Sequence, residues 1–188
     1  MVRQRLTILA VLALAALALS VAAVAGTVTA TATVTGAGSL SLSHGATASI
    51  SDTLDGSDQT VNYTLPLTMV DARGVGTGWN LTITSTTFND GASHTLATTA
   101  SSIASVTSTC VGGGTCTNPT NSTTYPTTYP TTVPAAATAP AAVKFFNSAL
   151  NTGMGRFTVT PSVNVTIPGN AYAGAYTSTL TVAAVSGP

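Results

Sequence analysis

The side chains suited to acid–base chemistry are few, and they lie in turn-like stretches far apart in the sequence. The chain has no glutamate, and its acids are the five aspartates Asp52, Asp55, Asp58, Asp71 and Asp90. His44 and His94 stand beside small turn-forming residues, and no G-x-S-x-G nucleophile elbow occurs. General acid–base catalysis needs a positioned acid and base, and this pattern offers no such pair. The sequence therefore predicts a protein that is not an enzyme; catalysis is the least favoured class.

The stretch "DTLDGSD" has two interpretations, because Asp52, Asp55 and Asp58 recur at every third position. Asp55-Gly56 is a typical hairpin-turn dipeptide. Three neighbouring carboxylates are also a potential calcium site, but the alternating ligands and the distal Glu of an EF-hand loop are missing. A plain hairpin turn is favoured over an ion site, and the sequence predicts no cofactor and no metal.

The charge balance excludes one class of partner. After residue 25 the basic side chains other than histidine are Arg73, Lys144 and Arg156, against five aspartates. A nucleic-acid-binding protein needs clustered Lys and Arg to neutralise phosphates. The sequence therefore predicts no nucleic-acid partner.

The N-terminus has the pattern of a secretory signal peptide. Arg3 and Arg5 precede the apolar run from Leu6 to Val24, and Ala23-Val24-Ala25 is a small-x-small cleavage site. Cleavage is expected between Ala25 and Gly26, which leaves no membrane span in the secreted chain. The alternative is an uncleaved anchor, since the run approaches the roughly 20 residues that span a bilayer. We expect residues 1–25 to be the signal peptide and residues 26–188 to form one domain.

The two cysteines, Cys110 and Cys116, flank the glycine-rich stretch "VGGGT". Disulfides persist outside the reducing cytosol, and glycines let so short a loop close. We expect a disulfide that clips a surface loop. Two cysteines without a nearby histidine make a poor zinc site.

Period-two alternation dominates the rest of the chain. It is clearest in Thr27–Thr35 and recurs around Leu40–Ile50, Val61–Met69, Trp79–Phe88, Ser101–Cys110, Phe157–Ile167 and Tyr176–Ala184. Pro66 marks an edge strand or a bulge. A short helix is expected only in "AAVKFFNSAL", residues 141–150, and the Thr- and Pro-rich stretch before it is expected to be an extended surface loop. The predicted fold is an all-β antiparallel sandwich, Greek-key or immunoglobulin-like, with long surface loops and at most one short helix.

The only tryptophan, Trp79, begins the alternating stretch "WNLTIT", in which it shares a face with Leu81 and Ile83. A tryptophan with strand periodicity most often fills the space between two sheets. That interpretation is favoured over an exposed binding platform, which stays the alternative.

Two stretches, "DARGVGTGWNLTIT" and the C-terminal "AGAYTSTLTVAAVSGP", resemble the WxL family of bacterial surface proteins. Trp79-Asn80-Leu81 matches the motif that gives the family its name. Residues in register with the second motif are Tyr176, Leu180, Thr181 and Pro188, but Val182 replaces its Trp and Ala184 its Leu. The resemblance implies a secreted protein held non-covalently on the cell wall, and the Val182 replacement puts that wall affinity in question.

The sequence favours two functions. The first is a surface protein that associates with a cell-wall polymer or with another surface protein, through loops that include Arg73, Gly74, Gly78, Tyr125 and Tyr129. The second is a structural subunit of an extracellular fibre or surface layer. It self-assembles by β-strand donation, with Thr27–Thr35 leaving its own sheet to complete a neighbour's. The more ordinary interpretation makes Thr27–Thr35 the first strand of its own sandwich.

Overall fold

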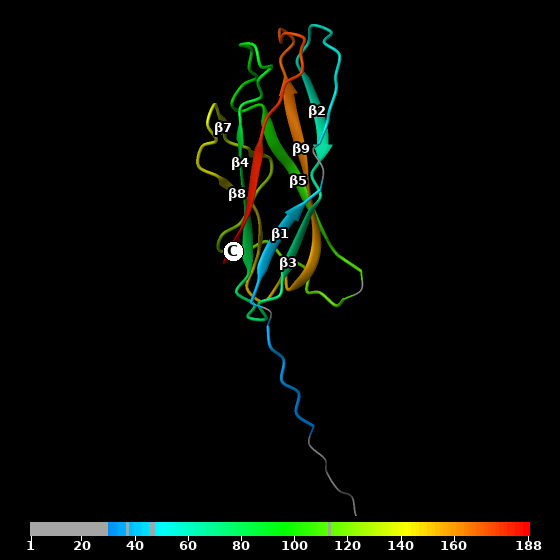
Figure 1. The fold of residues 1–188 in the computed structure, drawn as a ribbon, viewed down its shortest axis with the longest axis vertical. Helices are drawn as coiled ribbons and strands as arrows, with labels where there is room; N and C mark the ends of the chain where they lie inside the picture. The colour runs from blue at the N-terminus through cyan, green and yellow to red at the C-terminus, as the bar shows by residue number, and fades with distance from the viewer. Residues whose placement is uncertain (1–29, 37, 46–47, 113) are drawn as a thin grey trace, which may run out of the picture. The chain divides into compact units, whose positions relative to one another are not determined.

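The computed structural model describes residues 30–36, 38–45, 48–112 and 114–188 (Figure 1). The chain divides into two compact units, Met1–Val34 and Thr35–Pro188. Of the first unit the structure describes residues 30–34, which are exposed and have no regular secondary structure. The described residues of the second unit form ten strands and no helix.

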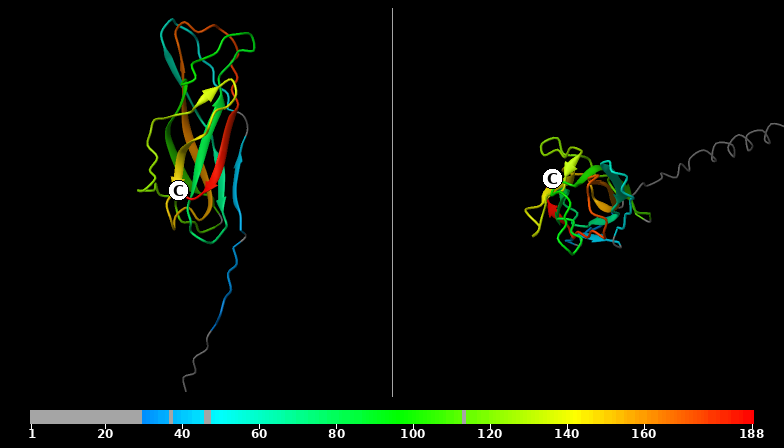
Figure 2. Two further views of the ribbon diagram at one scale, coloured as in Figure 1. Left: turned by 90° about the vertical axis from the view of Figure 1, so that its left-hand side faces the viewer. Right: turned by 90° about the horizontal axis from the view of Figure 1, so that it is seen from above.

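The strands form two sheets that pack face to face (Figure 2). The order in the larger sheet is β1 (Leu40–His44), β3 (Leu67–Asp71), β9 (Gly155–Ile167), β5 (Ser101–Cys110) and β6 (Thr131–Thr132), with β2 (Gln59–Thr64) also paired to β9. The order in the smaller sheet is β10 (Leu180–Ser186), β4 (Trp79–Thr86) and β7 (Ala135–Ala136), with β8 (Val143–Ser148) also paired to β4. Pairing is antiparallel except between β4 and β7. The predicted all-β sandwich is confirmed.

Alternating residues from both sheets build the core. Trp79, Leu81 and Ile83 of β4 face Phe157, Val159 and Val163 of β9, and all six are fully buried. Polar neighbours of the same strands, such as Thr82 and Thr158, are only half-buried. The period-two pattern thus determines which face of each strand is removed from water.

Pro66 separates β2 from β3, although both strands pair with β9 in one continuous register. The Leu65 amide donates to the Pro161 carbonyl at 3.0 Å, but Pro161 has no N–H to return the bond. With Pro66 also lacking a donor, the ladder is interrupted here. Pro66 itself belongs to no strand and lies between β2, which pairs with β9 on one side, and β3, which lies between β1 and β9.

Two expected elements are wrong. Residues 143–148 form strand β8, not a helix, because they pair with the free side of β4, with Phe146 opposite the core residue Leu81 and Asn147 opposite Asn80. In the described part of Thr27–Thr35, residues 30–35 form no strand and are exposed. The ordinary first-strand interpretation is therefore wrong for these residues, while residues 27–29 lie outside the described part of the chain.

The expected hairpin at Asp55-Gly56 is only partly correct. Gly56 has a positive φ of 88°, as a tight turn requires. Strand β2 follows the turn, but residues 48–54 before it form no strand. The turn is present without the second arm of a hairpin.

The predicted signal peptide, with its cleavage site at Ala25 and Gly26, lies outside the described residues. Among those that are described, none forms a helix of the length and apolarity that a bilayer span needs.

Candidate functional site

Trp79 is a core residue at the first position of β4. Its side chain is fully buried, and its ring centroid lies 5.8 Å from that of Phe146 and 6.4 Å from that of Phe157. The indole Nε1–H donates to the carbonyl of Gly153 at 2.8 Å. A Cβ on Gly153 would lie 2.6 Å from that Nε1, so only glycine fits at this position. The structure places Trp79 between the sheets and not on a platform.

Arg73, expected in a binding loop, is turned inward and connects three segments. It forms a 2.8 Å ion pair with Asp71 at the end of β3, and its guanidinium also donates to the Gly78 carbonyl at 2.7 Å and to Ser186 Oγ of β10. The hydrogen bonds from Arg73 hold the pKa of Asp71 below its usual value, and the same bonds raise the pKa of Arg73. This buried pair fixes the turn in front of Trp79.

The turn from Arg73 to Gly78 depends on glycine. Gly74 and Gly78 both have a φ of 70°, and a Cβ on Gly78 would lie 2.3 Å from the Ser148 carbonyl oxygen. Gly187 donates its amide to the Gly78 carbonyl at 3.1 Å, which brings the residue before Pro188 against this turn. Gly78 therefore serves close packing, while Gly74 is exposed.

The two family motifs lie on neighbouring strands. In the β4–β10 ladder Leu81 pairs with Ala184 and Ile83 with Val182. The half-buried Leu180 and Val182 line a groove of about 750 Å³, while Thr181 alternates to the exposed face. Tyr176 lies farther along the groove and donates its hydroxyl to the Tyr172 carbonyl at 3.0 Å.

A second loop presents aromatic and hydroxyl groups. Tyr125 is 57% exposed, and the Lys144 ammonium lies 5.4 Å from the centre of its ring while donating to its carbonyl at 3.0 Å. The Tyr129 hydroxyl donates to the Phe145 carbonyl at 2.7 Å, and burial raises the pKa of this phenol. Thus Tyr125 points to solvent, and Tyr129 anchors the loop to β8.

Asn147 holds the Tyr125 loop in place and was not expected from the sequence. It is fully buried; its Oδ1 accepts from the Ser122 amide and its Nδ2 donates to the Tyr125 carbonyl, both at 2.7 Å. The pattern that suggested a helix concealed this role. Its burial, which requires hydrogen-bond partners, is a property of the fold, so the sequence alone held no signal for this role.

The two predicted binding loops meet through the turn after β8. Ala149 donates its amide to the Thr120 carbonyl at 2.8 Å, and Asn151 donates its amide to the Gly76 carbonyl at 2.7 Å. The loop before Tyr125 and the turn before Trp79 are therefore joined at the same end of the sandwich.

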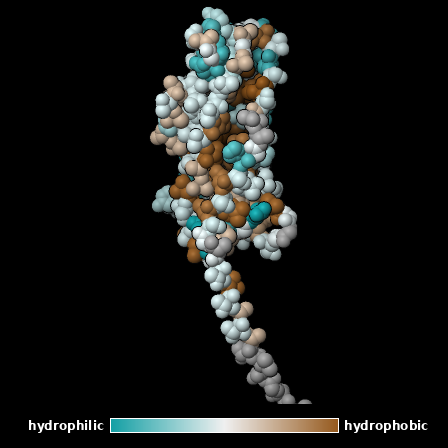
Figure 3. Space-filling view, in the orientation of Figure 1, coloured by the Kyte–Doolittle hydropathy of each residue, from teal (hydrophilic) through white to brown (hydrophobic). Residues whose placement is uncertain are grey.

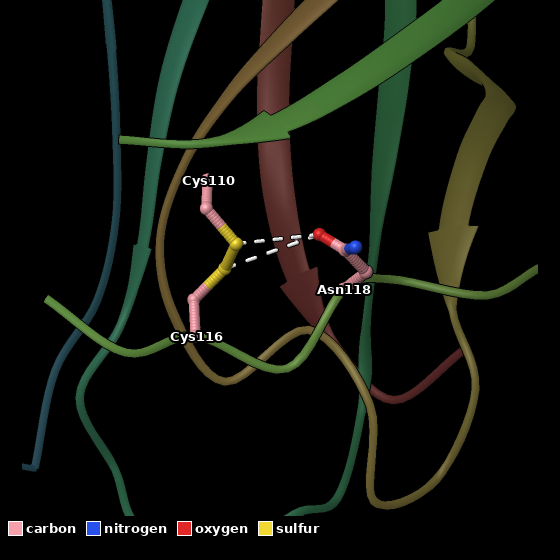
Figure 4. Close-up of a disulfide and its surroundings, with 3 residues drawn as sticks. All are labelled: Cys110, Cys116 and Asn118. Carbon is pink, nitrogen blue, oxygen red and sulfur yellow. Dashed lines mark hydrogen bonds between the residues drawn. A yellow bond between two sulfur atoms is a disulfide. The ribbon is translucent and has the colours of Figure 1, made fainter. Parts of the chain in front are cut away.

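The expected disulfide between Cys110 and Cys116 is confirmed (Figure 4). It connects the end of β5 to the stretch that leads into the Tyr125 loop, and Asn118 Oδ1 lies 3.3 Å from Cys110 Sγ. A Cβ on Gly155 would approach Cys116 Cβ to 2.9 Å, so the bridge sits directly against the first residue of β9.

The described acids are hydrogen-bonded to other groups of the fold. Asp55 accepts from Ser57, Asp58 accepts from the Gly169 amide, and the Asp90 carboxylate bonds His94 at 2.6 Å. The bond with His94 lowers the pKa of Asp90 to about 2. Within the described ranges, no three His, Cys or Asp side chains come together as a metal site would require.

A family model described as "WxL domain surface cell wall-binding" matches residues 26–184. No curated protein and no solved structure is detectably similar to the chain. The match includes β4 and the part of β10 up to Ala184, and so covers the positions at which Val182 and Ala184 stand.

Proposed function

Since the chain belongs to the WxL family of cell-wall-binding surface domains, we propose that it is a secreted, non-enzymatic surface protein that associates non-covalently with a wall polymer. The family match over residues 26–184 is the observation that carries this proposal. Family membership itself makes the chain a cell-surface domain that binds the wall.

The proposed contact is the loop around Tyr125. Trp79 is buried and hydrogen-bonded, so it is not available as a contact surface. Tyr125 instead offers an exposed ring, which suits stacking on the apolar face of a sugar, and Lys144 adds a positive charge beside it. Thr123, Thr124 and Thr128 are exposed along the same loop and supply hydroxyl groups for hydrogen bonds.

Rigid support strengthens this assignment. Asn147, Lys144 and Tyr129 each fix the backbone of the loop through the hydrogen bonds described above. A preorganised loop loses less conformational entropy when it binds. The Tyr125 ring is therefore presented on a fixed backbone and not on a loop that must order first.

Retention on purified cell walls tests the proposal. Tyr125→Ala should reduce the fraction of protein that sediments with walls at least severalfold, with the melting temperature unchanged. Tyr172→Ala is the matched control, since Tyr172 is similarly exposed but lies on the β9–β10 loop. Equal retention of the Tyr125 variant and the wild type would refute the proposed contact, and no sedimentation of the wild type would refute wall association itself.

The hydrogen bonds of the aspartates support the proposal that the protein is not an enzyme. Asp55, Asp58, Asp71 and Asp90 bond to neighbouring backbone or side-chain groups, which is a typical structural use of aspartate in turns. Their carboxylates cap turns and hold Arg73 and His94, and we assign them no role in catalysis.

A second candidate function is a subunit of an extracellular assembly built by β-strand donation. Two observations together favour it. Residues 30–35 are exposed outside any strand, and an open groove lies between the two sheets.

A further inference from the structure

An apolar groove runs between the edges of the two sheets. Among the described pairings, β10 pairs with β4, β1 with β3 and β2 with β9, so each of the three strands has one unpaired side. The groove of about 750 Å³ is lined by Leu42, Tyr63, Leu65, Leu180 and Val182, among others. Figure 3 shows the apolar surface that follows this side of the sandwich. We call it the β10 groove.

The edge of β10 offers free backbone groups along the groove. On the β4 side, the Thr86 amide donates to the Thr179 carbonyl and the Gly187 amide donates to the Gly78 carbonyl. In an antiparallel ladder successive residues alternate, so the N–H and C=O of Leu180, Val182 and Ala184 point away from β4. The side chains of the same three residues pack toward the core. A strand added here would gain both a ladder and an apolar surface.

Residues 28–35 have the composition that such a strand needs. Val28, Ala30, Ala32 and Val34 alternate with threonines, without charge or proline. The described residues 30–35 are exposed outside any strand, and Val34 is 93% exposed, the highest value among the exposed large apolar residues. Apolar side chains with strand periodicity that face water indicate a surface whose partner is another molecule.

We propose that residues 28–35 of one copy pair with the β10 edge of a second copy and place Val28, Ala30, Ala32 and Val34 over its β10 groove. At about 3.3 Å per residue the eight-residue stretch spans roughly 26 Å, and the seven residues of β10 span roughly 23 Å. Because β1 already lies beside part of β10, the donated strand pairs with the portion that lines the groove, Leu180 to Val182, and is long enough to extend beyond it. Its small side chains suit a groove already lined by Tyr63 and Leu65.

The link to β1 favours a second copy over the chain's own groove. A Cβ on Gly36 would lie 2.3 Å from the Arg73 carbonyl oxygen, and the Ser39 carbonyl accepts from the Ala72 amide at 3.0 Å. Folding residues 28–35 back along the same domain requires a reversal between residues 36 and 39. Gly36 and Ser39 both contact the backbone of residues 72–73, which leaves few residues free to make that reversal.

The first arm of the test compares two double variants of the full secreted chain by light scattering and electron microscopy. Ala30→Asp with Ala32→Asp charges the face proposed to enter the groove and should abolish assemblies larger than the monomer. Thr31→Asp with Thr33→Asp places the same charges on the opposite face and should leave assembly intact. Assembly that survives in both variants, or is lost in both, would overturn the proposed face.

The second arm blocks the acceptor. Val182→Trp fills the groove and should also give monomers, whereas Val185→Trp, on the 45%-exposed opposite face of β10, should assemble as the wild type does. The Val182→Trp chain keeps an intact donor, and the Ala30→Asp, Ala32→Asp chain keeps an intact acceptor. Mixing the two should therefore give a one-to-one dimer that grows no further. Absence of that dimer would overturn donation between copies.

This inference rests on the second function proposed above, and the outcomes separate the two. If the wild type forms no assembly at any concentration, both fail. If the wild type assembles but the blocking variants assemble equally well, the assembly function stands and strand donation through the β10 groove fails. Wall retention through Tyr125 is measured on monomers and is unaffected by either result.

Discussion

Trp79 connects parts of the chain that are far apart in sequence, because its ring packs on Phe146 and Phe157 and its Nε1 bonds residue 153. Strand periodicity was sufficient to predict a core position. The hydrogen-bond acceptor was not predictable, since it lies 74 residues away and depends on a turn that only glycine allows. Burial could be inferred from the local pattern, whereas the partner requires the tertiary fold.

Trp79→Ala should lower the free energy of unfolding by about 3–5 kcal/mol, the usual cost of removing a large buried ring. Trp79→Phe should cost less, because the cavity is smaller, although the Gly153 carbonyl loses its donor. Urea unfolding measures both. Because Trp79 is the only tryptophan, the native protein should also emit at short wavelength and resist aqueous quenchers. Freely quenched, long-wavelength emission would contradict the buried assignment.

The Asp71–Arg73 pair should make stability fall in acid. Hydrogen bonds from Arg73 lower the pKa of Asp71 in the folded protein below its unfolded value of about 3.9. This contribution is therefore complete above the unfolded pKa and is lost as the pH falls through the folded pKa. In urea titrations at a series of pH values, Asp71→Asn should be less stable at neutral pH and should lose less stability on acidification.

The control for Asp71 is Asp52→Asn, since the Asp52 carboxylate is exposed and bonds the amide of its chain neighbour Thr53. It should keep the acid slope of the wild type. An Asp71→Asn variant with an unchanged slope would show that the ion pair does not contribute to the acid sensitivity.

At the scale of elements, the clearest error is β8. The sequence "VKFFNS" is a short apolar run, and periodicity over so few residues fits both a buried helix turn and a strand. What decides the outcome is the free side of β4, where Leu81 pairs with Phe146 and Asn80 with Asn147. Neighbouring strands with long alternating stretches, such as β4 and β9, were predictable because each has a polar and an apolar face of its own.

The described part of Thr27–Thr35 shows the opposite error. Its alternation is the clearest in the chain, yet residues 30–35 form no strand. Period-two alternation predicts which residues would lie on each face of a strand. A strand also needs a neighbouring strand to which its backbone can hydrogen-bond. In a single copy residues 30–35 have no strand partner, so a strong local preference for strand did not produce a strand.

Loss of the Cys110–Cys116 bridge should be a mild defect. The cysteines are six residues apart, and closing so short a loop contributes about 2 kcal/mol by the chain-entropy estimate. Cys110→Ser with Cys116→Ser should therefore fold and unfold at a somewhat lower urea concentration. For comparison, Phe157→Ala in neighbouring β9 should cost about 3–5 kcal/mol. Complete unfolding of the double serine variant would contradict a peripheral bridge.

At the scale of the whole molecule, family membership and the sandwich together account for most of the chain, since the match extends from residue 26 to residue 184. The all-β fold was predictable from alternation. The position of the two motifs side by side on β4 and β10 was not, because sequence order does not reveal which strands pair across about 100 residues of intervening chain.

The secreted protein should begin at Gly26. The basic residues Arg3 and Arg5, the apolar run and Ala23-Val24-Ala25 together have the pattern of a cleaved signal peptide. Intact-mass measurement on protein released from walls should give the mass of residues 26–188 less two hydrogens for the disulfide. A mass that retains residues 6–24 would instead support a membrane anchor.

The segment before β1 and the segment after β10 both contact the turn that precedes Trp79. Gly36 lies against the Arg73 carbonyl, and Gly187 bonds the Gly78 carbonyl. Under mechanical load applied between residues 36 and 187, β1 would peel from β3 and β10 from β4 one hydrogen bond at a time, because the pull acts across the strands and not along them. Such a domain yields at low force when stretched by its own ends. It can withstand shear on a cell surface only if the force is applied at another site. That site is either a face of the sandwich or a strand hydrogen-bonded to β10.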